Sequence, residues 1–197
     1  MAVIALEGKT IGWALCGSHH TLARVLPVMA EVAHSGARVI PVVSETITST
    51  VTRFGGPEHW LSAITESAGQ PPLTTIPEVE PFGPDRTLDA LIVAPCTGNS
   101  LAKMANAVTD SAPLMAVKAQ LRGGGPVVLG ITTNDALGLN ARNLATLLVA
   151  RNVFFVPFGQ DNPETKPTSL VAHFELCADT LRAALAGRQL QPLLVPW

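Results

Sequence analysis

Apolar and polar positions alternate along the chain in a pattern that predicts strands and helices in turn. Short apolar runs predict five buried strands, at Thr10–Leu15, Arg38–Val43, Leu88–Val93, Pro126–Ile131 and Val153–Val156. Apolar residues at intervals of three and four predict helices at Leu22–His34, Glu58–Ala68, Leu101–Leu121, Leu144–Ala150 and Ser169–Leu185. The alternation predicts an α/β fold, with one doubly wound, Rossmann-like or flavodoxin-like domain over residues 1–197. Its parallel sheet should carry helices on both faces.

A few segments depart from this alternation. Pro113 should force a break or a restart in the third predicted helix, because proline lacks the N–H group that a helix interior requires. Gly69–Pro84 and Pro157–Pro167 are rich in proline and are predicted to be loops. The third strand is expected to leave the sheet at Ala94–Pro95, and Gln189–Trp197 is an apolar tail.

Composition changes this picture in one respect, the balance of apolar and charged residues. Of the 197 residues, 47% are hydrophobic and only 14% are charged, and the net charge is −2. A chain of this length can bury a full core, and the remaining apolar surface predicts a homo-oligomer. There is no basic cluster of the kind that binds nucleic acid. The candidates for the contact between subunits are Met104, Val108, Leu114 and Met115.

The start of the chain and the cysteines indicate the compartment. MAVIALEGKTIGWAL lacks the basic region of a signal peptide, and the chain has no apolar run of roughly 18 residues that would span a membrane. Cys16, Cys96 and Cys177 are odd in number, widely spaced and without a CxxC pair. This spacing predicts reduced thiols in a cytoplasmic protein and argues against a zinc site or another metal site.

The polar residues that could carry function follow four of the predicted strands. They form the turns Gly17–His20, Ser44–Thr46, Pro95–Ser100 and Thr132–Asp135. Because the carboxyl ends of parallel strands meet at one edge, these turns should converge. Their hydroxyl and amide groups, with a helix N-terminus, can hold a phosphate without Arg or Lys. The first turn has one glycine where a dinucleotide fingerprint has three, which argues against a nicotinamide site.

An ordinary structural role is the alternative for several of these residues. Asn99 or Ser100 could simply cap a helix in a common βα loop. His19 and His20 are candidates for ligand contact or proton transfer, or they are solvated first-turn histidines. Lys103 is interpreted as a surface or interface ion and Cys96 as a small buried residue.

Several longer motifs carry a family resemblance. They include GSHHT at Gly17–Thr21, IPVVSETI at Ile40–Ile47 and APCTGNSLAKMAN at 94–106. These motifs resemble the flavin-binding family of homo-oligomeric cysteine decarboxylases, which includes phosphopantothenoylcysteine decarboxylase and the prenylated-flavin synthases. TTNDALGLN at 132–140 and PFGQDNP at 157–163 are more specific. They resemble one branch of that group, the B subunits of dipicolinate synthases from spore-forming bacteria.

The resemblance implies a Rossmann-like flavoprotein that binds FMN near a subunit interface. It implies that Gly17 and Ser18 hold the phosphate and that Ser44 contacts the phosphate or the ribityl chain. Pro95–Ser100 would line the isoalloxazine and ribityl side. The candidate cofactor residues are therefore Gly17, Ser18, Ser44, Thr46, Pro95, Thr97, Gly98, Asn99, Ser100, Thr132 and Thr133. The decarboxylases carry a PAMN-type segment where this chain has ITTND, which argues against decarboxylation of a cysteine-derived substrate.

The resemblance also implies an oxidoreductase-type reaction shared with a second protein. The partner would be an A subunit that uses NADP, and the product would be pyridine-2,6-dicarboxylate, made during sporulation from a reduced dihydrodipicolinate-type precursor. Three possibilities stay open for this chain: a flavoprotein subunit, a non-catalytic partner of the A subunit, or a stand-alone flavin decarboxylase.

A small dicarboxylate substrate requires cationic donors, because buried carboxylates without partners are costly. Arg53 and Arg142 are the leading candidates, because the planar guanidinium group can hold a carboxylate through two bonds. Lys118 and Lys166 are the weaker candidates, and any of the four could be solvated instead.

Overall fold

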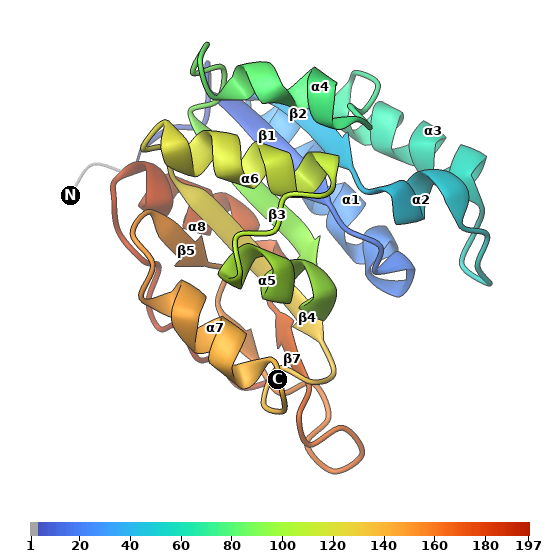
Figure 1. Cartoon of the computed structure of the whole chain (residues 1–197), viewed down its shortest axis with the longest axis vertical. Helices are drawn as coiled ribbons and strands as arrows, with labels where there is room; N and C mark the ends of the chain where they lie inside the picture. Colours follow the sequence, from blue (N-terminus) through green and yellow to red (C-terminus); the bar gives the residue numbers. More distant parts are fainter. Residues whose placement is uncertain (1–3) are drawn as a thin grey trace.

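A mixed β-sheet of seven strands runs through the molecule (Figure 1), and the computed structural model describes residues 4–197. The strands are β1 Thr10–Leu15, β2 Arg38–Val43, β3 Ala90–Cys96, β4 Val127–Thr133, β5 Val153–Phe155, β6 Phe158–Gly159 and β7 Leu170–Ala172. Strands β2, β1, β3, β4 and β5 pair in parallel in that order. This is the flavodoxin-like order, which confirms the predicted fold class.

Helices cover both faces of this sheet. In Figure 1, α6 lies in front of the strands, whereas α1 and α8 lie behind them. Pro57 and Pro113 fall in the first turns of α3 and α6, where proline is tolerated, so Pro113 begins a helix after the break that it was predicted to cause. The helices are α1 His19–His34, α2 Glu45–Ser49, α3 Pro57–Ala68, α4 Ile76–Val79, α5 Gly98–Ala105, α6 Ala112–Arg122, α7 Ala141–Leu148 and α8 Cys177–Leu185, with 3₁₀ turns at Glu80–Phe82 and Phe174–Leu176.

Strand β3 is longer than predicted. It continues through the cis Ala94–Pro95 peptide to Cys96, and its pairing with β4 shifts register between Val93 and Cys96. The Pro95 carbonyl accepts a hydrogen bond from the Cys16 backbone N–H at 3.2 Å. The prediction that the strand leaves the sheet at Ala94–Pro95 was wrong, because proline loses only a donor and its carbonyl can still bond to a neighbouring strand.

The predicted helix Ser169–Leu185 was also wrong in its first half. Leu170–Ala172 forms strand β7, which pairs antiparallel with the end of β4 and with β6, and α8 starts only at Cys177. A short apolar run fits both periods, so the pattern alone did not separate strand from helix. The predicted Pro157–Pro167 loop accordingly contains β6 and becomes part of a β6–β7 hairpin.

The apolar tail closes over this hairpin. Val195 N–H donates to the Phe158 carbonyl at 3.1 Å. The Trp197 indole N–H donates to the Val171 carbonyl at 3.1 Å, and its ring stacks on His173 with centroids 4.7 Å apart. The tail therefore holds the hairpin in place against the sheet.

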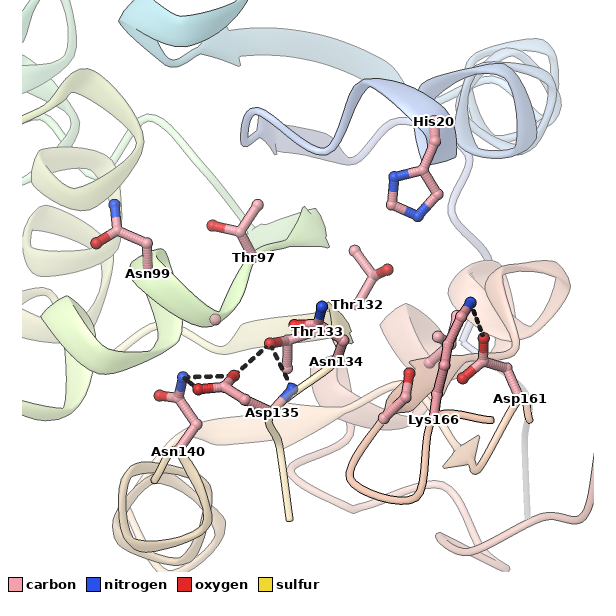
Figure 2. Close-up of a pocket in the computed structure, with 13 residues that line it drawn as sticks. His20, Thr97, Asn99, Thr132, Thr133, Asn134, Asp135, Asn140, Asp161 and Lys166 are labelled. Carbon is pink, nitrogen blue, oxygen red and sulfur yellow. Dashed lines mark hydrogen bonds and ion pairs between the residues drawn. The ribbon is translucent and has the colours of Figure 1, made fainter. Parts of the chain in front are cut away.

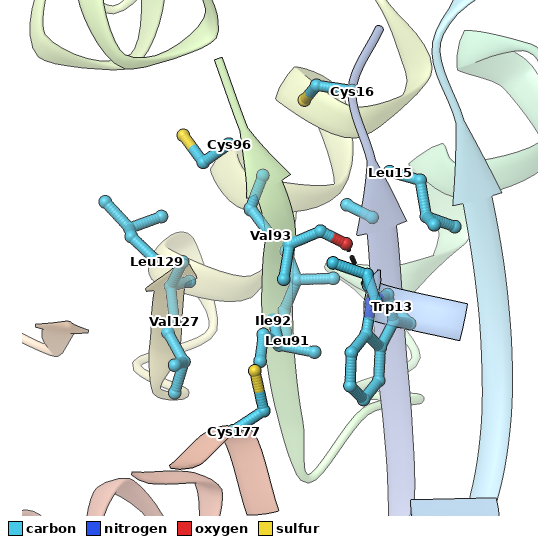
Figure 3. Packing of buried hydrophobic residues seen from close by; sticks show 14 of the residues in the cluster. Trp13, Leu15, Cys16, Leu91, Ile92, Val93, Cys96, Val127, Leu129 and Cys177 are labelled. Atoms are coloured by element: carbon cyan, nitrogen blue, oxygen red, sulfur yellow. Dashed lines mark hydrogen bonds between the residues drawn. The ribbon is translucent and has the colours of Figure 1, made fainter. Parts of the chain in front are cut away.

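The core lies between the sheet and its helices (Figure 3). Trp13 and Leu91 are fully buried on adjacent strands, and the Trp13 indole N–H donates to the Ala94 carbonyl at 2.9 Å. The three cysteines are also buried, and burial raises the pKa of each thiol. Among residues 4–197, no helix combines the length and the apolar character needed to cross a membrane.

Candidate functional site

A polar cavity of about 480 Å³ opens at the carboxyl edge of the sheet (Figure 2). Ligands of open α/β sheets bind at this edge, beside the point where the strand order reverses. In this sheet the reversal lies between β1 and β3. The lining residues are His20, Thr97, Gly98, Asn99, Thr132, Thr133, Asn134, Asp135, Asn140, Asp161, Lys166, Ser169 and Val171.

The turn after β3 forms one wall. Thr97 caps α5, since its hydroxyl accepts a hydrogen bond from the Ser100 backbone N–H at 3.2 Å. A β-carbon at Gly98 would overlap the Thr133 hydroxyl and would lie 3.0 Å from Oδ1 of Asp135. Glycine is therefore required here for the close approach of the β3 and β4 turns, and the α5 N-terminus adds partial positive charge beside the cavity.

A chain of polar side chains holds the wall formed after β4. Asp135 Oδ1 accepts hydrogen bonds from the Thr133 hydroxyl at 2.7 Å and from the Asn140 amide at 2.8 Å. The side-chain oxygen Oδ1 of Asn140 accepts a hydrogen bond from the Asn143 side-chain amide at 2.8 Å, and both asparagines are buried. A network with these bonds made is rigid, so this wall presents fixed polar groups to a ligand.

The β6–β7 hairpin forms the opposite wall. Lys166 Nζ lies 3.2 Å from Oδ2 of Asp161. Burial alone would raise the pKa of Asp161, but hydrogen bonding by Ser169 and Lys166 together with the lysine charge gives a net lowering. The loop therefore presents an ion pair at the cavity margin.

His20 lies above this ion pair, at the start of α1 (Figure 2). Partial burial is the main cause of the lowered pKa of His20, and the charges of Lys166, Arg24 and Arg53 lower it further against the opposing effect of Asp161. His20 is consequently neutral near pH 7, where its ring can donate or accept a hydrogen bond.

The structure divides the predicted site residues between this cavity and the neighbouring turns. It brings His20, Thr97, Gly98, Asn99, Thr132, Thr133 and Lys166 into the lining. The remaining predicted residues do not line the cavity, and they are Gly17, Ser18, His19, Ser44, Arg53, Thr46, Pro95, Ser100, Lys118 and Arg142.

The turns after β1 and β2 pack closely on each other. A β-carbon at Gly17 would lie 2.6 Å from Cγ2 of Thr46, so the bare backbone of the first turn touches the second. The Ser18 and Thr21 hydroxyls share a hydrogen bond of 2.9 Å. Ser44 Oγ and His19 Nε2 are buried without a hydrogen-bond partner among the described residues. Buried polar atoms of this kind require a partner, which a bound ligand can supply.

The two arginines predicted to hold carboxylates are exposed and separate. The Arg53 guanidinium lies 4.8 Å from the centroid of the Phe54 ring, and that ring lies 6.2 Å from His20. Arg53 therefore stands near the cavity margin, whereas Arg142 is exposed on α7.

Six lining residues were not among the predicted site residues, namely Asn134, Asp135, Asn140, Asp161, Ser169 and Val171. Asn134 and Asp135 belong to a turn that sequence reasoning did select, so their strand-end position was the available signal. Asn140 and Asp161 lie in the motifs TTNDALGLN and PFGQDNP, so membership of these motifs was an available signal. Ser169 and Val171 reach the cavity through the hairpin, and no local pattern reveals its placement.

Comparison with known proteins agrees with this architecture. The Flavoprotein family model matches residues 4–178. The chain is 50% identical over 191 residues to the dipicolinate synthase B subunit of Bacillus subtilis (strain 168), which covers 97% of this chain and 96% of the relative. The crystal structure of the dipicolinate synthase B subunit from Bacillus halodurans C superposes with a TM-score of 0.90 at 48% identity, covering 98% of both chains.

A more distant structure shows how widely the fold is shared. The FMN-dependent cysteine decarboxylase SpaF has a TM-score of 0.69 at 20% identity, over 92% of this chain and 99% of SpaF. At this identity the likeness shows the fold alone. Taken with the two closer relatives, the chain belongs to the flavoprotein family, within its group of dipicolinate synthase B subunits.

Proposed function

We propose that this chain is the FMN-binding subunit of a dipicolinate synthase. It acts with a nicotinamide-dependent A subunit, which uses NADP, to form pyridine-2,6-dicarboxylate from a reduced dihydrodipicolinate-type precursor. The observation that carries the proposal is the 50% identity to a B subunit across 97% of the chain. On this proposal the protein works in the cytoplasm during sporulation. The stand-alone decarboxylase is less well supported, because the decarboxylase SpaF shares only 20% identity.

The residues at the carboxyl edge fit a flavin mononucleotide. Gly17 and Gly98 leave the backbone bare on either side of the switch point, and Ser44 Oγ is buried without a partner among the described residues. Gly17, Ser18 and Ser44 would hold the phosphate and the ribityl chain, and Thr97 would line the ring side. When bound, FMN would supply a two-electron carrier beside the NADP of the A subunit, and the one pair of electrons that leaves the substrate ring would be taken up by one of these two groups.

The cavity residues would hold and orient the substrate. Aromatisation of a dihydropyridine ring removes two hydrogen atoms, which are two electrons and two protons. The site must therefore hold the ring in place and provide a group that accepts a proton. His20 is a neutral imidazole at the margin and can exchange a proton there, while the Asp135 network holds the opposite wall.

We also propose that the protein is a homo-oligomer. Met104, Val108 and Leu114 line an apolar groove of about 250 Å³ between α5 and α6. Val108 is 39% exposed, whereas Leu114 is only 4% exposed and forms the floor of the groove. Sedimentation at micromolar concentration should show a species larger than the 20.6 kDa monomer, and a monomer would contradict this proposal.

Titration of the apo-protein with FMN tests the cofactor proposal. Binding should quench flavin fluorescence, and Ser18→Asp should weaken binding by roughly 1.5–3 kcal/mol because a carboxylate replaces a phosphate contact. Ser62→Asp on the exposed face of α3 is the control with the same charge change. Ser18 is buried, so an aspartate there also places a charge in the protein interior. Ser18→Ala removes the hydroxyl without burying a charge, and it should weaken FMN binding less than Ser18→Asp does.

The outcomes separate the three possibilities. If Ser18→Asp folds and binds FMN as wild type does, the phosphate lies elsewhere. A protein that binds no FMN but raises the activity of the A subunit is the non-catalytic partner. A protein that binds FMN and releases carbon dioxide from a cysteine-terminated peptide without the A subunit is the decarboxylase.

A further inference from the structure

We propose that Lys166 on the β6–β7 hairpin anchors a carboxylate of the substrate at one end of the polar cavity. The inference rests on the proposed function for the identity of the acid, a pyridine carboxylate. It rests on the structure for the location of the anion site.

The charges in the cavity lining are separated in space. Lys166, Asp161 and His20 lie together at one end, whereas Asn99 and Asn140 lie at the other (Figure 2). Lys166 is the one lysine or arginine among the lining residues. Asp161 offsets the Lys166 charge, so this end carries no net negative charge, whereas the other end carries the Asp135 carboxylate, and a carboxylate that enters the cavity is favoured at the Lys166 end.

The other carboxylate in the lining disfavours the opposite orientation. Asp135 lies beside Asn140, whose amide is 2.8 and 3.0 Å from its two oxygens. A substrate carboxylate placed there would face a like charge at short range. The geometry therefore favours a carboxylate at the Lys166 end over one at the Asp135 end.

The Lys166 ammonium group retains bonding capacity. It has three donors, and its one described partner is Asp161 Oδ2 at 3.2 Å. The lysine side chain is 54% exposed, against 20% for Asp161, so the ammonium group can reach a ligand while the aspartate orients it from below.

The backbone of the hairpin holds Lys166 in position. Lys166 N–H donates to the Asn162 carbonyl at 2.8 Å, and Ser169 N–H donates to the Lys166 carbonyl at 3.0 Å. The Gln160 amide donates to the Pro167 carbonyl at 2.9 Å across the base of the loop. The backbone that carries the anchor is therefore ordered before a ligand binds.

Calorimetry in metal-free buffer tests the proposal, with pyridine-2,6-dicarboxylate, pyridine-2-carboxylate and the uncharged pyridine-2,6-dimethanol as probes. Lys166→Gln should weaken binding of both acids at least tenfold, because a charge-assisted hydrogen bond is lost. Lys166→Arg should retain most of the affinity. Lys9→Gln is the matched control and should bind like wild type, because Lys9 also pairs with an aspartate, Asp89 at 3.0 Å, but lies just before β1, at the opposite edge of the sheet.

The results divide clearly. The anchor is refuted if the Lys166→Gln variant binds both acids with wild-type affinity. It is also refuted if the variant loses as much affinity for pyridine-2,6-dimethanol as for the acids. Either result stands even where FMN binding upholds the proposed function. Absence of acid binding to an FMN-loaded wild type refutes it as well. A loss of affinity for the acids but not for the dimethanol in Lys166→Gln supports the anchor. If the wild-type protein shows this pattern but binds no FMN, the anchor stands and only the proposal of FMN binding fails.

Discussion

The two halves of the carboxyl edge differ in what they leave for a ligand. In the β1–β2 half, the Gly17 backbone packs on Thr46, and buried polar atoms of Ser44 and His19 lack partners among the described residues. In the β3–β4 half, an open cavity is lined by Asp135 and other side chains that already bond to one another. The second half is preformed apart from Asp161 Oδ1, which is also buried without a hydrogen-bond partner among the described residues, whereas the first half has two such atoms and no comparable network. This difference suits a tightly held cofactor beside an exchangeable substrate.

The largest expected effect is on the pH dependence of the free energy of unfolding, and it compares the buried cysteine thiols next to the two halves. Cys16 follows β1, and hydrogen bonding from Ser100 and Thr97 partly opposes the rise in its pKa that burial causes. The pKa of Cys96, at the end of β3, is raised well above its ordinary value by burial and then by Cys16. A raised pKa in the folded state contributes stability that is complete below the unfolded value of about 8.5 and is lost as pH rises towards the folded value.

The free energy of unfolding should therefore fall above about pH 8.5, by up to about 1.4 kcal/mol per pH unit for each thiol. Urea unfolding between pH values of about 7 and 10.5 measures this slope. Cys96→Ala should flatten the curve more than Cys16→Ala. Equal slopes for the two variants would show that the thiols under the two halves do not differ.

The next largest effect separates the halves by function. Gly17→Ala forces a β-carbon against Thr46, and Gly98→Ala forces one against the Thr133 hydroxyl, so each should cost about 1–3 kcal/mol of stability. Gly17→Ala should weaken FMN binding and spare the dicarboxylate, whereas Gly98→Ala should weaken both. Gly83→Ala is the control, because its β-carbon would approach no atom closer than 3.5 Å. Equal loss of FMN and dicarboxylate in Gly17→Ala would remove the functional distinction.

The smallest effect concerns the proton at the cavity margin. Lys166→Gln should raise the pKa of His20, because one of the positive charges that lower it is removed, while Arg24, Arg53 and Asp161 remain. Addition of pyridine-2,6-dicarboxylate to wild type should raise it too. Histidine NMR titration measures both shifts, and Lys9→Gln, which removes a lysine at the opposite edge of the sheet, should leave the pKa of His20 unchanged. An unchanged value in Lys166→Gln would place the lysine charge too far from His20 to matter.

Local patterns predicted most of the parallel sheet. Strands β1 and β2 match their predicted bounds, because each is a continuous apolar run closed by polar or glycine residues. The errors lie where tertiary pairing decides the conformation. Leu170–Ala172 becomes a strand because the end of β4 offers a free edge, and no signal within the segment reports that edge.

The same limit applies to the cavity. Strand-end position was enough to select Thr97, Gly98 and Thr132, which do line it. Arg53 and Arg142 ranked above Lys166 because guanidinium geometry suits a carboxylate, but which cation reaches the cavity depends on the path of the hairpin. Chemical suitability can be read from residue type, whereas proximity across long stretches of chain requires the fold.

Strand β4 pairs with two different strands, and this allows the β6–β7 hairpin, which forms one wall of the cavity, to vary without changing the parallel sheet. Val127–Leu129 pairs with β5, and Thr132–Thr133 pairs with β7, so the hairpin attaches to the strand that ends at the cavity. The tip between Asn162 and Thr168 takes part in no strand pairing of the sheet. Loops of this kind tolerate changes in length and sequence. A few residues at this tip can therefore change during evolution and alter the cavity wall that carries Lys166, while the parallel sheet beneath is inherited intact.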